Sequence, residues 1–372
     1  MIFTGYPRWK LRTEGLPMEK IKTFPWLQTL YMGKGRFGIS SPWFDQELSW
    51  WAQQTLDAYV ARRLPNCDVF IGLSGSGLAS GRMAKRRGTK YICDRGSSHI
   101  RFQDRILREE YDRWGVTFRG IDSRIMAKEE AEYDAADIVT VPSEFAYRTF
   151  IAEGIPKERV TKIPYGVDLS RFSKVAIPSP DSFDVLFVGQ VSFRKGFPYL
   201  LEAFKRFRHT HKRLTVVGSV HPDIREYLSR QSMDEVVFLG PQPEVRLKEI
   251  MSASHVMVLP SIEEGLALVQ AQAMACGCPV ISSSHTGADD LFVDRREGFI
   301  VGIRDAQAIT DRLENLAQNK ELQPTMSAAA QARVKARGGW NAYGNAMIEL
   351  FSRLNDRLPS TNLDPSRELQ IS

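Results

Sequence analysis

The sequence is poor in cysteine and in net charge, and each shortage excludes a class of protein. Four cysteines in 372 residues are too few for the disulfide framework of a small secreted domain. Cys276 and Cys278 also lack the spacing of a zinc site, so we interpret the cysteines as buried free thiols. Lys+Arg number 50 against Asp+Glu 44, and the resulting charge of +6 is too diffuse for a nucleic-acid-binding surface.

Long apolar runs are also scarce. Residues 265–288 carry no formal charge, but glutamines, a proline and serines interrupt the stretch, so we do not expect a transmembrane helix there. The residues after Met1 lack the basic-then-apolar order of a signal peptide. Together with the reduced cysteines, these features predict a cytoplasmic protein.

The sequence does contain short apolar segments that alternate with amphipathic ones. This pattern is typical of parallel sheets covered by helices and predicts an α/β protein with two doubly wound domains. In the first half we predict strands at residues 69–73, 90–93, 138–141 and 160–163. In the second half we predict strands at residues 184–188, 214–217, 236–239, 256–259 and 279–282.

The same pattern gives a domain plan. We expect an N-terminal domain at residues 1–170 and a C-terminal domain at residues 183–338. The remaining segments are a linker at 171–182, a helix at 339–358 that could cross back to the first domain, and a flexible tail at 359–372.

Two cations stand at the start of a helix in the second domain. A strand ends at Gly189, and Arg194 and Lys195 then precede Gly196 and a helical stretch. Free N–H groups at a helix start attract anions, and the two cations supply full charges for a phosphate pair. Taken alone, the segment is equally compatible with an ordinary loop that bears solvated cations.

A second polar group follows the strand predicted at 256–259. Glu264 is expected at the start of a helix beside Gly265, whose missing side chain lets a ligand approach the backbone. Gln272 lies eight residues on and would project from roughly the same helix face. Glu264 alone could be a helix cap, but two aligned polar groups at the end of a parallel strand favour a ligand site.

These segments, in this order, resemble the family-4 retaining glycosyltransferases of the GT-B fold, in which two Rossmann-like domains face each other across a cleft. The resemblance covers nearly the whole chain. In the second half it rests on Phe187–Gly189, Arg194–Gly196, Pro260–Ser261, Glu264–Gly265, Ala273–Gly277, Pro279–Ile281 and Thr286–Ala288. In the first half it rests on Ala136–Ile138, Val141–Ser143, and Ile163–Asp168 with Phe172.

The resemblance implies a hexosyltransferase that uses a nucleotide-diphosphate sugar, retains the anomeric configuration, and needs neither a metal nor another cofactor. Lys195, with Arg194 beside it, matches the cation that neutralises the leaving diphosphate, and Glu264 matches the first glutamate of the family's paired motif. The donor-binding residues implied are Gly189, Arg194, Lys195, Glu264, Gly265, Leu266, Ala267 and Gln272. The physical logic agrees, because fixed cations and amides stabilise charge that develops on a leaving phosphate.

The partners implied are the nucleotide-sugar donor and a saccharide or lipid-linked saccharide acceptor in polysaccharide biosynthesis, with no nucleic acid. Peripheral contact with the inner face of the membrane would bring the enzyme to a lipid-linked acceptor.

The sequence departs from the family pattern at three places. Gln272 stands where the second glutamate is expected to hold the donor ribose, and Gln190 stands where an arginine is common. The family usually begins with a strand and a glycine-rich loop, whereas the first clear strand here begins at Val69. We therefore expect the N-terminal domain to lack its first βα unit.

The first half offers candidates for the acceptor side. Asp94 and His99 lie in a polar loop after a strand, where family members often place a histidine that meets the reacting sugar. Either could fill that role, with His99 as a catalytic candidate and Asp94 on the acceptor side, but His99 could equally be structural. We assign Gly75 and Gly77, which follow the preceding strand, to the acceptor side as well.

Two other functions stay open on the sequence. Gly75, Gly77 and Gly81, with Asp94 at the end of the next strand, form an approximate dinucleotide fingerprint of an NAD-type oxidoreductase. The departure at Gln272 and the short N-terminal region also suit a catalytically inactive nucleotide-sugar-binding homologue.

Overall fold

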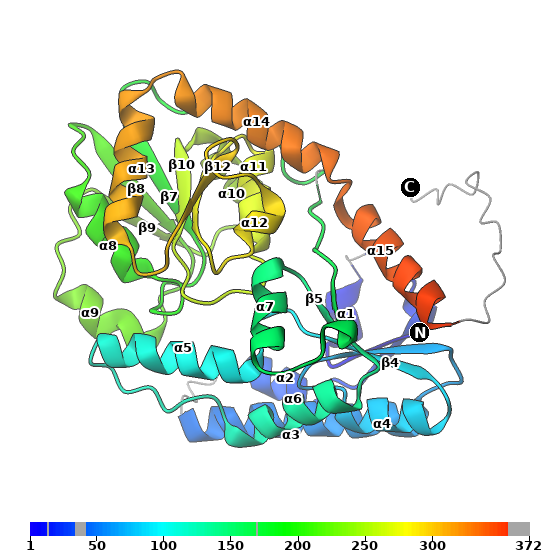
Figure 1. The fold of residues 1–372 in the computed structure, drawn as a ribbon. Helices are drawn as coiled ribbons and strands as arrows, with labels where there is room; N and C mark the ends of the chain where they lie inside the picture. The colour runs from blue at the N-terminus through cyan, green and yellow to red at the C-terminus, as the bar shows by residue number, and fades with distance from the viewer. Residues whose placement is uncertain (13–14, 34–41, 169, 356–372) are drawn as a thin grey trace.

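The computed structural model describes residues 1–12, 15–33, 42–168 and 170–355 (Figure 1). In this part of the chain, the larger sheet has six parallel strands in the order β12-β11-β10-β7-β8-β9. Its strands are β7 (Phe183–Val188), β8 (Lys212–Val217), β9 (Val236–Gly240), β10 (Val256–Leu259), β11 (Val280–Ser283) and β12 (Gly298–Val301). The helices that accompany it are α8 (Phe197–Arg206), α9 (Arg225–Ser229), α10 (Glu244–Ala253), α11 (Leu268–Ala275), α12 (Ala288–Leu291), α13 (Ala306–Gln318) and α14 (Leu322–Ala336).

A second parallel sheet has four strands in the order β3-β4-β5-β6. These are β3 (Val69–Leu73), β4 (Lys90–Asp94), β5 (Ile138–Val141) and β6 (Val160–Lys162). The helices of this half are α1 (Arg8–Leu11), α2 (Trp26–Gly33), α3 (Pro42–Arg63), α4 (Leu78–Arg86), α5 (Ile100–Arg113), α6 (Ser123–Ala135) and α7 (Glu144–Ala152). A small parallel sheet pairs β1 (Ile2–Thr4) with β2 (Ile21–Thr23), and short 3-10 turns lie at Met18–Lys20, Lys157–Arg159 and Pro222–Ile224.

The α/β class with two parallel sheets is confirmed, and the predicted strands agree with the structure to within two residues. The central strand β7 shows why runs of apolar residues predict these strands. Val185 and Phe187 belong to the core on one face of the sheet, whereas Leu186 belongs to the core on the other. All three side chains are completely buried, so every position along the strand has to be apolar.

Strand β12 was not predicted. It opens on Gly298, where an added Cβ would lie 2.5 Å from the Val280 carbonyl oxygen of β11. The sheet therefore needs a glycine at this position, although a glycine in the sequence usually indicates an interruption of a strand.

The helix α5 joins the two halves. It starts beside β4, but Ile106, Leu107 and Tyr111 along its second part belong to the core of the large sheet. Buried Glu110 accepts hydrogen bonds from the Tyr199 hydroxyl at 2.8 Å and from Arg304 Nε at 2.6 Å. In Figure 1 this helix lies beneath the second domain, and its far end reaches α9.

The chain crosses between the halves again near its C-terminal end. Helix α15 (Gly339–Leu354) follows α14, and its Met347 and Leu350 pack against Ile92 and Ile163 of the first half. Figure 1 shows α15 leaving the large sheet and running toward the first half. The tail expected at residues 359–372 lies outside the described residues.

Candidate functional site

The loop after β7 is held against the loop after β10. Gly196 adopts a φ of +65°, and a Cβ there would lie 1.9 Å from the Pro260 carbonyl oxygen. The Arg194 carbonyl accepts the Ile262 N–H at 2.8 Å. An added Cβ at Gly189 would lie 4.0 Å from Lys195 Cε, so the strand end lies beside the lysine. The two loops thus meet at the carboxyl edge of the sheet, where open α/β sheets bind ligands.

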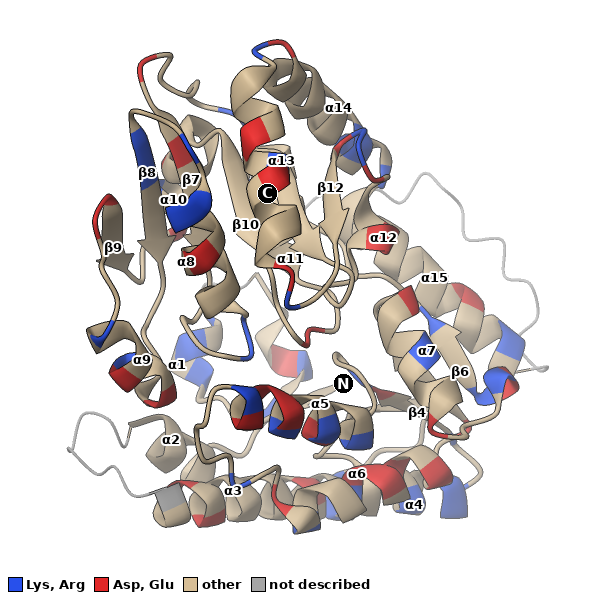
Figure 2. Cartoon of the chain, turned by 60° about the vertical axis from the view of Figure 1, so that its left-hand side comes forward, with Lys and Arg blue, Asp and Glu red and all other residues tan. Residues whose placement is uncertain are grey.

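Two consecutive cations pair with two consecutive glutamates at this junction. Lys195 Nζ forms an ion pair with the Glu264 carboxylate. Arg194 Nη2 lies 2.9 Å from Glu263 Oε2. The Lys195 and Glu264 side chains keep 20% and 18% of their surface exposed, so a ligand can reach this pair. In Figure 2 the charged loops below α8 and α11 face α5.

The expectation that Glu264 starts a helix is wrong. Helix α11 begins at Leu268, and Ala267 before it has an extended backbone. The reason is a close approach between the two halves: a Cβ on Gly265 would lie 1.9 Å from the Gly96 carbonyl oxygen. The same-face argument for Gln272 assumed a continuous helix from Glu264 and therefore does not hold.

The rest of the donor-side loop is buried and hydrogen-bonded within the protein. Leu266 and Ala267 are buried, and the Ala267 N–H donates to the Thr286 carbonyl at 3.2 Å. Buried Gln270 supports this loop, because its Nε2 donates to the Ala267 and Thr286 carbonyls at 3.2 and 2.9 Å. Gln272 is partly exposed on α11.

Asp94 lies close to two tyrosines. Its carboxylate accepts a hydrogen bond from Thr140 Oγ1 at 2.8 Å. Burial raises the pKa of Asp94, and the Thr140 hydrogen bond partly opposes this. Burial, and to a smaller extent the charge of Asp94, raises the pKa of Tyr343 to about 12. The same two causes raise the pKa of Tyr165.

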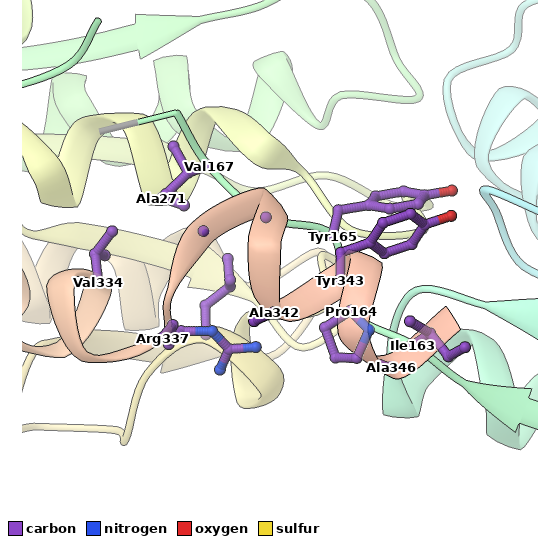
Figure 3. Close-up of a pocket in the computed structure, with 13 residues that line it drawn as sticks. Ile163, Pro164, Tyr165, Val167, Ala271, Val334, Arg337, Ala342, Tyr343 and Ala346 are labelled. Atoms are coloured by element: carbon purple, nitrogen blue, oxygen red, sulfur yellow. The ribbon is translucent and has the colours of Figure 1, made fainter. Parts of the chain in front are cut away.

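Figure 3 shows the Tyr165 and Tyr343 rings side by side, with both hydroxyls pointing away from Arg337. They line a cavity of about 120 Å³ where the chain crosses between the halves. The Tyr165 hydroxyl also lies 3.0 Å from where a Cβ on Gly96 would stand. Asp94 is therefore near the junction of the two halves.

His99 has a structural position. Its Nδ1 accepts the Arg101 N–H at 3.3 Å, which caps α5, and its ring packs against Tyr133 and Phe150. Burial lowers the pKa of His99 to about 4, so the ring is neutral at pH 7. The residues that line the cavity beside His99, among them Arg101, Glu130 and Glu153, all belong to the first half. These contacts favour Asp94 over His99 as the first-half candidate.

The glycine loop after β3 is occupied by side chains of the protein. The Gly75 and Gly77 N–H groups donate to the Glu132 carboxylate at 2.5 and 2.8 Å. Asp57 accepts the N–H groups of Ala79 and Ser80, both at 2.9 Å. A pyrophosphate needs these same N–H groups and would be repelled by two buried carboxylates, so the loop does not suit a dinucleotide.

The third glycine of that pattern has a packing role. A Cβ at Gly81 would lie 2.4 Å from the Tyr91 ring. The sequence pattern therefore reflects close helix–strand packing and not phosphate binding.

Sequence reasoning missed Glu263. This residue is completely buried between the halves, where Ser97 Oγ and Ser98 Oγ donate to its Oε1, both at 2.6 Å. The partners lie 165 or more positions away in the chain, so a local motif could not reveal them. An acid beside the motif residue Glu264 was the only available signal.

The chain is similar to curated glycosyltransferases. Residues 171–333 match the family model described as "Glycosyl transferases group 1". Among curated proteins, the chain is 27% identical over 192 residues to the "Putative colanic acid biosynthesis glycosyltransferase WcaL" of Escherichia coli K12, covering 48% of this chain and 47% of the relative. It is 28% identical over 259 residues to the "D-inositol 3-phosphate glycosyltransferase" of Xylanimonas cellulosilytica, covering 64% and 61%. The chain thus spans about half to three fifths of the length of these relatives.

Solved structures share the fold over most of the chain. Sucrose-phosphate synthase from Thermosynechococcus elongatus superposes with a TM-score of 0.67 at 23% identity, covering 85% of this chain and 80% of that one. Anabaena Alr3699/HepE in complex with UDP gives a TM-score of 0.68 at 17% identity, covering 93% and 89%. The predicted GT-B fold is confirmed.

A metal-binding cluster and a membrane-spanning helix are both absent from the described residues. No group of three or more histidine, cysteine, aspartate or glutamate side chains is placed there to hold a metal ion. No helix in the same part of the chain is both long and apolar enough to cross a bilayer.

Proposed function

We propose that this protein is a retaining, metal-independent hexosyltransferase that moves a sugar from a nucleoside-diphosphate donor to a glycan or lipid-linked acceptor. The observation that carries the proposal is the accessible Lys195–Glu264 pair between the two halves of a GT-B fold. The relatives support the pathway class, since they include capsular polysaccharide and amylovoran biosynthesis glycosyltransferases. UDP and UDP-glucose in the HepE structures support the donor class.

The proposed reaction requires from the protein mainly charged side chains that are held at fixed positions. Cleavage of a glycosyl–phosphate bond builds negative charge on the leaving diphosphate, and the Lys195 ammonium with Arg194 beside it stabilises that charge. Glu264 would accept hydrogen bonds from donor hydroxyl groups, since an ionised carboxylate is an acceptor only. Gln272 would meet the donor ribose, and Asp94 would face the acceptor.

The inactive homologue is the competing function, whereas the occupied Gly75–Gly77 loop argues against the oxidoreductase. A thermal-shift panel with UDP-, GDP- and ADP-sugars and NAD separates the three. A ligand at a hundredfold excess over its Kd stabilises a protein by about 2.7 kcal/mol, so we expect one nucleotide-sugar class to raise the Tm by a few degrees.

Turnover of that same donor would then exclude the inactive homologue. A shift with NAD alone, or with no compound of the panel, would refute the proposal.

We further propose a cytoplasmic location with peripheral attachment to the inner membrane face through the N-terminal region. Five of the seven tryptophans lie among the first 51 residues: Trp9, Trp26, Trp43, Trp50 and Trp51. Trp9, Trp26 and Trp43 are 65%, 71% and 67% exposed, and the basic residues Arg8 and Lys10 flank Trp9. Exposed tryptophan with basic neighbours is typical of surfaces that bind anionic bilayers.

Sedimentation with vesicles tests this attachment. We expect binding to vesicles that contain anionic lipid, weaker binding at high salt, and a severalfold loss in Trp26→Ala and Trp43→Ala. Trp340→Ala is the matched control, because Trp340 is 46% exposed and lies on α15, outside the first 51 residues. Equal binding by all three variants would exclude these tryptophans as the anchor.

A further inference from the structure

Glu263 is a completely buried carboxylate with hydrogen-bond donors from both halves of the molecule. From the first half, Ser97 Oγ, Ser98 Oγ and Ser98 N donate to Oε1 at 2.6, 2.6 and 3.2 Å, and Gln103 Nε2 donates to Oε2 at 2.8 Å. From the second half, Arg194 Nε donates to Oε2 at 3.1 Å. The carboxylate is therefore fully satisfied only while the two halves are together.

The charge of Glu263 depends on these partners. Burial alone would raise the pKa of this carboxyl, but the Arg194 charge and the hydrogen bonds from Ser97, Ser98 and Gln103 together lower it to about 2. Glu263 is thus ionised throughout the physiological range. Separation of the halves would break the hydrogen bonds from three first-half side chains at once and leave Arg194 as the remaining side-chain partner of this carboxylate.

On the first-half side of this contact, Arg95 bonds several of the neighbouring residues. Arg95 Nη2 donates to Gln103 Oε1 at 2.9 Å, and Arg95 Nε donates to the Ser98 carbonyl at 3.0 Å. Arg95 Nη1 also lies 2.6 Å from Glu129 Oε2. Arg95 therefore connects the loop that meets Glu263 to α5 through Gln103 and to α6 through Glu129. We call Arg95, Ser97, Ser98, Gln103, Arg194 and Glu263 the interdomain clamp.

The clamp lies one residue from the candidate donor site on both loops. Arg194 of the clamp precedes Lys195, and Glu263 precedes Glu264. Arg194 Nε also donates to the Glu263 backbone carbonyl at 3.2 Å, so the two loops are fastened at this point. By contrast, the Lys195–Glu264 pair is partly exposed and can exchange its partners for a ligand.

We infer that Glu263 is a positioning residue that couples contact between the two halves to the placement of Lys195 and Glu264. It bonds the first-half segment at residues 97–103 and the Arg194 guanidinium at the same time, so Lys195 and Glu264 reach their positions only when the halves are joined. The kinetic consequence rests on the proposed function. The structural consequence is the ordering of both loops, and it does not depend on the proposed function.

Glu263→Gln keeps the shape of the side chain but removes its charge, and Glu110→Gln is the matched control. Glu110 is also completely buried and also bonds α5 to the second half, through Tyr199 and Arg304, but it is not part of the clamp. Amide hydrogen exchange of the ligand-free variants gives the structural readout. We expect faster exchange at residues 95–99 and 260–266 in Glu263→Gln, and unchanged exchange at both segments in Glu110→Gln.

Steady-state kinetics gives the second readout. We expect Glu263→Gln to raise the donor KM about tenfold or more, as for loss of a buried charge partner, and Glu110→Gln to leave it within about twofold. Ser97→Ala removes one donor from the clamp and should reproduce the exchange change in milder form, which keeps the inference testable if Glu263→Gln does not fold.

Unchanged exchange at residues 95–99 and 260–266, or equal KM effects in Glu263→Gln and Glu110→Gln, would overturn the inference. If the wild-type protein turns over no nucleotide sugar, the proposed function fails, and the exchange result alone decides the role of Glu263.

Discussion

Lys195→Ala is expected to lower kcat for sugar transfer by roughly 10²–10³-fold, the usual loss when one preorganised donor to a developing anion is removed. Lys195 is the cation of the site whose partner is accessible, because Glu264 keeps 18% of its side-chain surface exposed whereas the Glu263 partner of Arg194 is fully buried. Arg194 cannot replace Lys195 in full, since its guanidinium also bonds the Glu263 carboxylate and backbone carbonyl.

The measurement is kcat with the donor that the thermal-shift panel identifies, together with the Tm of each variant. Lys205→Ala is the control, because Lys205 is a surface lysine on the next helix whose Nζ bonds Gln231 at 2.8 Å. Lys195→Arg keeps the charge and should retain more activity than the alanine variant. Wild-type kcat in Lys195→Ala would show that the leaving group is stabilised elsewhere.

The strands could be predicted from the sequence because their physical signal is local. Every position of β7 is buried on one face or the other, so the strand is a continuous apolar run. The cations Arg194 and Lys195 could be found for the same reason, since they stand beside a glycine at a strand-to-helix turn.

Side-chain contacts between residues far apart in the sequence could not be predicted. The start of α11 was misplaced because Gly265 lies against Gly96, which is 169 positions away in the sequence. The glycines at 75 and 77 looked like a phosphate loop because the sequence does not show that the Glu132 carboxylate fills it from 55 or more positions away. Glu263 was overlooked since each of its first-half partners lies 160 or more positions away.

Glu264→Ala is expected to lower kcat by roughly 10²-fold, comparable to the removal of one charge-assisted hydrogen bond in a preorganised site. Two effects combine here: the donor sugar loses an acceptor, and Lys195 loses the carboxylate that places it in the absence of donor. The variant should fold normally, because this side chain is partly exposed and lies in a loop ahead of α11.

Glu264→Gln separates those two effects. The amide keeps a carbonyl acceptor for sugar hydroxyls but cannot form an ion pair with Lys195. If hydrogen bonding to the donor dominates, Glu264→Gln should retain most of the activity. If the main effect of Glu264 is to position Lys195 through its charge, Glu264→Gln should be as slow as Glu264→Ala.

The Lys195→Ala/Glu264→Ala double variant then gives the coupling between the two side chains. Because they are in direct contact, their effects on kcat should combine to less than the product of the single losses, while a full product would mean that the pair does not act as a unit.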